Sequence, residues 1–130
     1  MKMDIVIVDD DAVVLFLHKI LVNKTLHSGC SHEFDNAERA LEFILERKDT
    51  QQPLLVLLDI NMPCMTGWQF LEVLQEKISA KNVFVVMVTS SVNSSDKKKA
   101  EQYPLVVEYL EKPLSRQSCS GLCDRLNRLS

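Results

Sequence analysis

Apolar residues along the chain fall into two kinds of pattern, which alternate from one end to the other. Apart from Asp4, residues 4–8, 54–58 and 83–88 are continuous apolar runs that show no alternation with polar residues. Such runs are typical of strands that are covered on both faces in a parallel sheet. Residues 30–34 and 106–110 are less apolar, and we therefore predict that they form the two edge strands.

Between these strands, apolar residues recur every three or four positions, which is the helical period. This period predicts helices at residues 13–21, 37–45 and 70–78, and a last helix after Ser115, its predicted N-cap. Residues 94–103 are mostly polar, and we predict that they form a fourth helix of the series with little apolar area. The stripe that marks the first helix consists of Val13, Phe16, Leu17, Ile20 and Leu21. The stripe of the last helix consists of Cys119, Leu122, Cys123, Leu126 and Leu129.

Five strand–helix units in regular alternation predict a parallel sheet with right-handed crossovers. Because the three apolar strands need cover on both faces, the strand order 2-1-3-4-5 accommodates every segment. The predicted class is therefore α/β, a doubly wound (βα)5 fold of the flavodoxin type, and at 130 residues we expect one domain spanning residues 1–130. Ligands of such sheets lie beyond the carboxyl ends of the strands, here between strands one and three.

Charge and composition narrow the choice of partners. The formal net charge of −3 gives no reason to expect binding to nucleic acid or to an anionic membrane. The basic run at 97–99 lacks accompanying aromatic or Arg residues, so we interpret it as a solvated helix face. No apolar stretch approaches the length of a membrane span, and the N-terminus lacks a signal cleavage site, so we expect a cytoplasmic protein.

The four cysteines are Cys30, Cys64, Cys119 and Cys123, and they lack paired C-x-x-C spacing. We predict buried free thiols. A zinc site built from these cysteines and the three histidines would need ligands from distant segments without a spacing signature, which disfavours it.

Polar residues directly follow four of the five predicted strands. They are Asp9, Asp10 and Asp11 after the first, Asp59 and Asn61 after the third, Thr89 and Ser90 after the fourth, and Glu111 and Lys112, which precede Pro113, after the fifth. Two carboxylates about 4 Å apart repel by roughly 4 kcal/mol at an effective dielectric constant near 20, so such a cluster favours a bound cation. Taken singly, each residue could be a helix cap or a turn. Their joint occurrence at one sheet edge favours a functional site, and oxygen ligands suit Mg²⁺.

These motifs together resemble the receiver domain of bacterial two-component response regulators, and the resemblance covers essentially the whole chain. It is carried by residues 7–11, by 57–63 with Gly67, by 88–90 and by 111–113. It implies that Asp59 accepts a phosphoryl group from a sensor histidine kinase or a phosphotransfer protein in a phosphorelay. It also implies that Asp10 and Asp59 bind Mg²⁺ directly, that Asp9 binds it through water, and that the backbone carbonyl of Asn61 adds a ligand.

The resemblance assigns roles to further residues. Lys112 would pair with the phosphoryl oxygens, Thr89 would bond one of them, and Tyr109 would reorient with Thr89 as a switch. The Lys112–Pro113 bond would be cis. Pro63 and Gly67 would be structural residues.

Three alternatives remain open at this point. A magnesium-dependent aspartyl phosphatase needs a second Asp two residues after its nucleophile, where this chain has Asn61, so the general acid is absent. The chain could be an unphosphorylated interaction module, or a receiver cut from a longer regulator. If the chain is complete, its output must be a partner protein. We expect phosphorylation to alter the face made by the fourth helix, fifth strand and fifth helix, and we expect this face to meet a downstream partner or a second copy. We expect no enzyme activity beyond the protein's own phosphorylation and dephosphorylation.

Overall fold

The computed structural model describes residues 3–26, 30–47, 52–78, 82–90 and 93–129. Five strands form one parallel sheet in the order β2-β1-β3-β4-β5, which confirms the predicted topology. The strands are β1 (Asp4–Val8), β2 (Cys30–Phe34), β3 (Leu54–Asp59), β4 (Val83–Thr89) and β5 (Val106–Glu111). The helices are α1 (Ala12–Thr25), α2 (Ala37–Glu46), α3 (Gly67–Lys77), α4 (Ser94–Glu101) and α5 (Arg116–Leu129).

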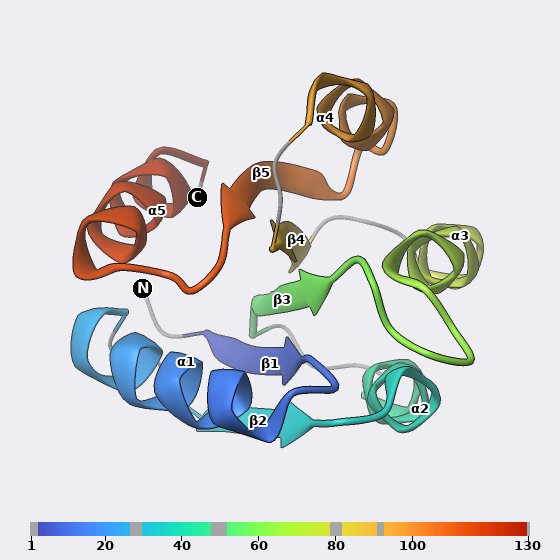
Figure 1. Cartoon of the computed structure of the whole chain (residues 1–130), viewed down its shortest axis with the longest axis horizontal. Helices are drawn as coiled ribbons and strands as arrows, with labels where there is room; N and C mark the ends of the chain where they lie inside the picture. Colours follow the sequence, from blue (N-terminus) through green and yellow to red (C-terminus); the bar gives the residue numbers. More distant parts are fainter. Residues whose placement is uncertain (1–2, 27–29, 48–51, 79–81, 91–92, 130) are drawn as a thin grey trace.

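Helices cover both faces of the sheet, with α1 and α5 on one side and α2, α3 and α4 on the other (Figure 1). This arrangement explains the unbroken apolar strands. In β3, Val56 and Leu58 belong to the core under α2–α4, whereas Leu55 and Leu57 belong to the core under α1 and α5. Every residue of β3 is buried, so neither face of this strand tolerates a polar position until its last residue, Asp59.

Helix α1 begins directly after Asp11, as the sequence suggested, but the side that it buries is not the predicted apolar stripe. Asp11 is its N-cap, and the Asp11 Oδ1 atom accepts hydrogen bonds from the N–H groups of Val13 at 2.9 Å and Val14 at 3.3 Å. The residues that α1 buries are Leu15, His18 and Val22.

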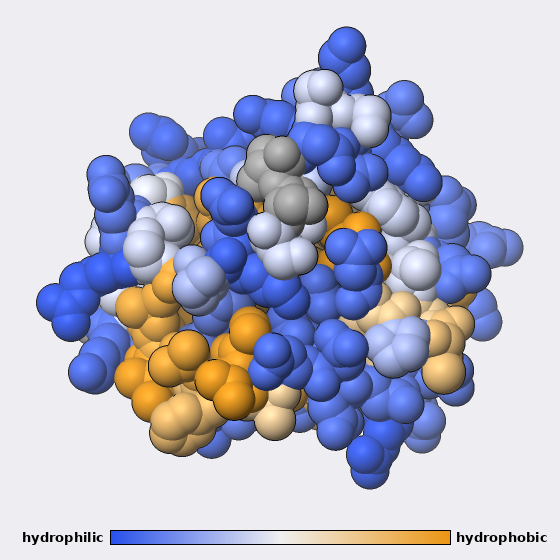
Figure 2. Space-filling view, in the orientation of Figure 1, coloured by the Kyte–Doolittle hydropathy of each residue, from blue (hydrophilic) through white to orange (hydrophobic). Residues whose placement is uncertain are grey.

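The predicted apolar stripe of α1 therefore lies largely in solvent. Val13 is 66% exposed, Phe16 61%, Leu17 48% and Ile20 39%. Figure 2 shows apolar side chains gathered over α1, at the lower left of the view. The period correctly predicted a helix, but α1 is apolar over most of its circumference, so the period could not select the side that faces the sheet.

The last two helices follow the predicted pattern closely. Ala100 is the buried residue of α4, so this helix offers little apolar area to the core, as its polar sequence predicted. At α5, the Ser115 hydroxyl accepts a hydrogen bond from the Ser118 N–H at 3.0 Å, which confirms the predicted cap. Cys119, Leu122 and Leu126 of the predicted stripe are buried, and the side chain of Leu129 lies outside the described part of the structure.

The prediction for the cysteines is right for Cys119, which is buried, and wrong for Cys64, which is exposed in the loop after β3 at a φ of 70°. Cys123 is half-buried, and the side chain of Cys30 is not described. Cys64, Cys119 and Cys123 are free thiols. Within the described ranges, no helix is both long and apolar enough to cross a membrane.

Candidate acidic site at the carboxyl ends of the strands

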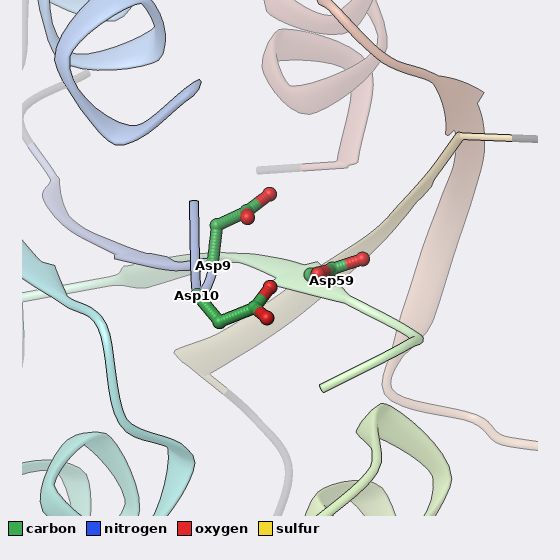
Figure 3. A group of neighbouring side chains, drawn as sticks. All are labelled: Asp9, Asp10 and Asp59. Carbon is green, nitrogen blue, oxygen red and sulfur yellow. The ribbon is translucent and has the colours of Figure 1, made fainter. Parts of the chain in front are cut away.

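Three carboxylates meet where β1 and β3 end. The parallel pairing of these neighbouring strands sets Val8 beside Leu58, so the residues that follow, Asp9 and Asp59, emerge together. Oxygen atoms of Asp9, Asp10 and Asp59 lie within 4.8 Å of one another (Figure 3). This is the metal-ligand cluster that the described residues form, and it contains neither cysteine nor histidine, so the zinc alternative has no support there.

The two acids after β1 occupy different environments. Asp9 is buried, and its two oxygens are already engaged: Oδ1 accepts the Asp11 N–H at 2.9 Å, and Oδ2 lies 2.9 Å from Lys112 Nζ. Asp10 is exposed. The Asp10 carboxylate is therefore the more accessible of the two for direct contact with an ion.

Asp59 is a buried carboxylate with one poorly satisfied oxygen. Its Oδ1 accepts the Asn61 N–H at 3.3 Å, whereas its Oδ2 makes no hydrogen bond with any described residue and lies 3.4 Å from Lys112 Nζ. Burial, and next the charge of Asp9, raise the pKa of Asp59 to about 6, against the opposing effects of Lys112 and the Asn61 N–H. The charge of ionised Asp59 is therefore only partly compensated by Lys112.

Lys112 reaches the acids from the end of β5, and its side chain is 15% exposed. Burial acts against its charged form, but the hydrogen bond to Asp9 and the charge of Asp59 outweigh it and raise the pKa of Lys112, which is therefore an ammonium ion at neutral pH. The Lys112 N–H donates a hydrogen bond to the Thr89 carbonyl at 2.7 Å, which ties the end of β5 to the end of β4. The Lys112–Pro113 bond is cis, the form that the resemblance implies.

Thr89 and Tyr109, the two residues that the resemblance assigns to a switch, lie on the neighbouring strands β4 and β5. Thr89 is the last residue of β4, next to β3, and is buried. Tyr109 on β5 packs against the core under α2–α4, and its hydroxyl oxygen is buried beside the start of α4, near Asn93 and Asp96.

Gly67 lets α3 begin directly against the end of β3. Its N–H donates a hydrogen bond to the Ile60 carbonyl at 2.8 Å, and an added Cβ would lie 2.7 Å from the Asp59 carbonyl oxygen and 2.9 Å from the Ile60 Cα. Because those contacts are with backbone atoms, a side chain at this position would clash sterically with the backbone of Asp59 and displace it. Pro63 accepts a hydrogen bond from the Met65 N–H at 2.7 Å in the intervening turn.

The family model for the response regulator receiver domain matches residues 5–122. This chain belongs to that family. The receiver is similar over almost its whole length to two solved structures. A two-component response regulator from Cytophaga hutchinsonii has a TM-score of 0.85 at 24% identity, with 99% of this chain and 98% of that chain covered. A response regulator receiver protein from Dyadobacter fermentans has a TM-score of 0.80 at 30% identity, with 98% and 97% covered.

The fold similarity extends to more distant chains. A chemotaxis protein CheY4 from Vibrio cholerae superimposes with a TM-score of 0.75 at 18% identity, with both chains covered completely. No match was found among curated proteins.

The donor set of this receiver fits Mg²⁺. All three side chains offer carboxylate oxygens, and Asp10 is accessible. The buried Asp59 carboxylate accepts one hydrogen bond, at 3.3 Å on Oδ1, and none on Oδ2 among the described residues, so one oxygen can bind an ion while the other stays free to react. Hard oxygen donors with a high negative charge are what Mg²⁺ requires.

One buried residue behind the site was missed by sequence reasoning. His18 of α1 is 2% exposed, and its Nε2 accepts the Leu114 N–H at 3.1 Å, two residues after Lys112. The available signal was a single histidine within an apolar helical segment, which does not by itself reveal a partner 96 residues away.

Proposed function

We propose that this receiver accepts a phosphoryl group on Asp59 from a histidine kinase or a histidine phosphotransfer protein, and that the reaction requires Mg²⁺. The observation that carries the proposal is the state of Asp59 Oδ2, which is buried, without a hydrogen bond among the described residues, and 3.4 Å from the Lys112 ammonium. A carboxylate oxygen that is not engaged in a hydrogen bond keeps its lone pairs available, so it can act as a nucleophile toward an electrophilic phosphorus atom.

Asp59, Lys112 and Thr89 would supply the nucleophile, a positive charge and a hydrogen-bond donor for the phosphoryl transfer. Asp59 Oδ2 attacks the phosphorus atom, and the new P–O bond forms as the P–N bond of the phosphohistidine breaks and the imidazole leaves. With a pKa of about 6, Asp59 is mostly ionised at neutral pH. Lys112 balances charge on the transferring oxygens, and the Thr89 hydroxyl donates a hydrogen bond to one of them. Mg²⁺, bound by Asp10, Asp59 and the Asn61 carbonyl with Asp9 acting through water, would supply further positive charge at those oxygens.

The same residues argue against hydrolysis of outside substrates. Asn61 stands where an aspartyl phosphatase would place its general acid, and an amide cannot donate and recover a proton in that role. We therefore propose a signalling protein that catalyses only its own phosphorylation and dephosphorylation in the cytoplasm.

The exposed apolar patch of α1, made by Val13, Phe16, Leu17 and Ile20, supports a docking surface for the phosphodonor protein. The patch begins two residues after Asp11, so a protein bound there stands beside the acidic site. Contiguous exposed apolar residues next to a reactive group are typical of an interaction surface. The output face proposed for α4, β5 and α5 is separate, and it has a hollow of about 270 Å³ lined by residues that include Lys97, Tyr109 and Arg125.

Incubation with acetyl phosphate and Mg²⁺, followed by intact-protein mass measurement, tests the acceptor. We expect a gain of one phosphoryl group in the wild type, none in Asp59→Asn, and none in the wild type with EDTA. Asp35→Asn serves as a control, because Asp35 lies outside the acidic cluster and should leave the gain intact. A phosphoryl gain that persists in Asp59→Asn would contradict the proposal.

A further inference from the structure

His18 is a buried polar residue to which the proposed chemistry assigns no role. It is 2% exposed and lies on the side of α1 that faces the core shared with α5, close to apolar residues such as Leu15 and Val22. A polar side chain in such a place costs stability unless it is hydrogen-bonded. The bond that satisfies it joins its Nε2 to the Leu114 N–H at 3.1 Å.

That bond fixes the segment that carries Lys112. The Lys112 N–H is held by the Thr89 carbonyl at 2.7 Å, and the Leu114 N–H is held by His18, so the chain is pinned on both sides of Pro113. Pro113 has no N–H of its own to contribute a third anchor. The position of the ammonium between Asp9 and Asp59 thus depends on two backbone hydrogen bonds, of which one comes from α1.

The chemical state of His18 suits this role. Nε2 can accept the Leu114 N–H only when it carries no proton. Burial lowers the pKa of His18, an effect that Asp9 opposes and Lys112 reinforces, so the neutral imidazole is the form present at neutral pH.

We propose that His18 is a positioning residue for Lys112: by holding the Leu114 N–H, it fixes the segment that aims the ammonium at Asp59. The proposal rests on the proposed phosphoacceptor function and adds to it a residue that touches none of the reacting atoms. The His18→Leu substitution would fill a similar volume with apolar atoms but leave the Leu114 N–H without an acceptor in the core. The His18→Gln substitution would offer an amide oxygen as acceptor in place of Nε2.

The first measurement is the initial rate of phosphorylation by acetyl phosphate. We expect His18→Leu to react about tenfold more slowly than the wild type, because small misplacements of a catalytic group are costly, and His18→Gln to recover most of the rate. Val22→Ala is the matched control, since Val22 is fully buried one turn further along the same helix and has no part in the Leu114 bond. It should keep the wild-type rate despite a lower melting temperature. Equal rates in His18→Leu and Val22→Ala would overturn the proposal.

A double-mutant cycle shows whether the effect passes through Lys112. In a Lys112→Ala background, His18→Leu should slow phosphorylation by less than about twofold, because the group that it positions is gone. A full tenfold loss in that background would overturn the proposal.

A readout that does not involve Asp59 separates this proposal from the proposed function. The rate at which acetic anhydride modifies the Lys112 amine, followed by peptide mass, should rise several-fold in His18→Leu and remain unchanged in His18→Gln and Val22→Ala. If the wild type takes no phosphoryl group but Lys112 responds in this way, the acceptor assignment fails and the positioning role stands. If the wild type is phosphorylated but the Lys112 amine reacts at the same rate in every variant, the positioning role fails.

Discussion

The ionised form of Asp59 destabilises the folded receiver, so the free energy of unfolding depends on pH. Its folded pKa of about 6 lies above the unperturbed value of 3.8, so the folded state holds the proton more tightly than the unfolded state does. Stability is therefore lost as pH rises between these two values, and the full cost, on the order of 3 kcal/mol, is present above the folded pKa.

We expect Asp59→Asn to stabilise the metal-free protein at pH 7.5 by about 2–3 kcal/mol, and to lose this advantage as pH falls toward 4. Urea unfolding in EDTA across this pH range measures the difference in free energy of unfolding between Asp59→Asn and the wild type. The control is Asp124→Asn, which alters an exposed carboxylate on α5 and should change little at either pH. A wild type that is as stable as Asp59→Asn at pH 7.5 would show that the carboxylate is not destabilising.

Two glycines should respond to alanine in opposite directions. At Gly67 a Cβ would collide with the backbone of Asp59 and Ile60, so Gly67→Ala should destabilise the protein by about 1–3 kcal/mol and slow phosphorylation. At Gly121, inside α5, a Cβ meets nothing within 4 Å, so Gly121→Ala should stabilise the protein by about 0.5–1 kcal/mol. Denaturant midpoints at constant m-value distinguish the two effects, and a shared sign would refute the steric argument.

Among the elements, α4 is held to its neighbours mainly by contacts at the surface. The Lys99 ammonium lies 4.6 Å from the centre of the Trp68 ring, and Tyr103, just after α4, stacks on the same ring at 5.9 Å between centroids. The Tyr103 hydroxyl donates a hydrogen bond to Glu72 Oε1 of α3 at 2.6 Å. With Ala100 as the buried residue of the helix itself, these contacts give α4 little apolar anchoring.

We expect beryllofluoride with Mg²⁺ to change amide hydrogen exchange in α4 and β5, because Thr89 would turn toward the phosphoryl mimic and free space for Tyr109. Asp59→Asn under the same conditions should show no such change. Altered exchange confined to residues 9–11 and 59–67, with residues 93–112 unaffected, would rule out the switch.

For the molecule as a whole, Mg²⁺ should raise the melting temperature, because an ion that binds the folded state alone stabilises it by mass action. At a concentration about 100 times its dissociation constant, the gain is about 2.7 kcal/mol. Asp10→Asn should remove more of this gain than Asp9→Asn does, since both oxygens of Asp9 are already engaged by Asp11 and Lys112. Melting curves with and without millimolar Mg²⁺ provide the measurement, and an equal loss in the two variants would contradict the assigned ligand roles.

Local patterns in the sequence were sufficient for the topology and for the residues that gather at the site. Burial on both faces makes the central strands uniformly apolar, and parallel strands deliver their last residues to one edge, so Asp9, Asp59, Thr89 and Lys112 could be placed together from their positions after the strands. The roles of these residues came from the family resemblance, and the experiments above test them.

Tertiary structure alone decided which side of α1 is buried, because a helix with apolar residues on most of its circumference has no single face that its period can select. It also decided that Cys64 is exposed, since a small apolar residue in a loop carries no periodic signal. The bond between His18 and Leu114 joins residues 96 positions apart, and it exists only because α1 and the segment after β5 pack on the same face of the sheet. Contacts of that range depend on how helices settle against the sheet, and no local pattern in the chain encodes them.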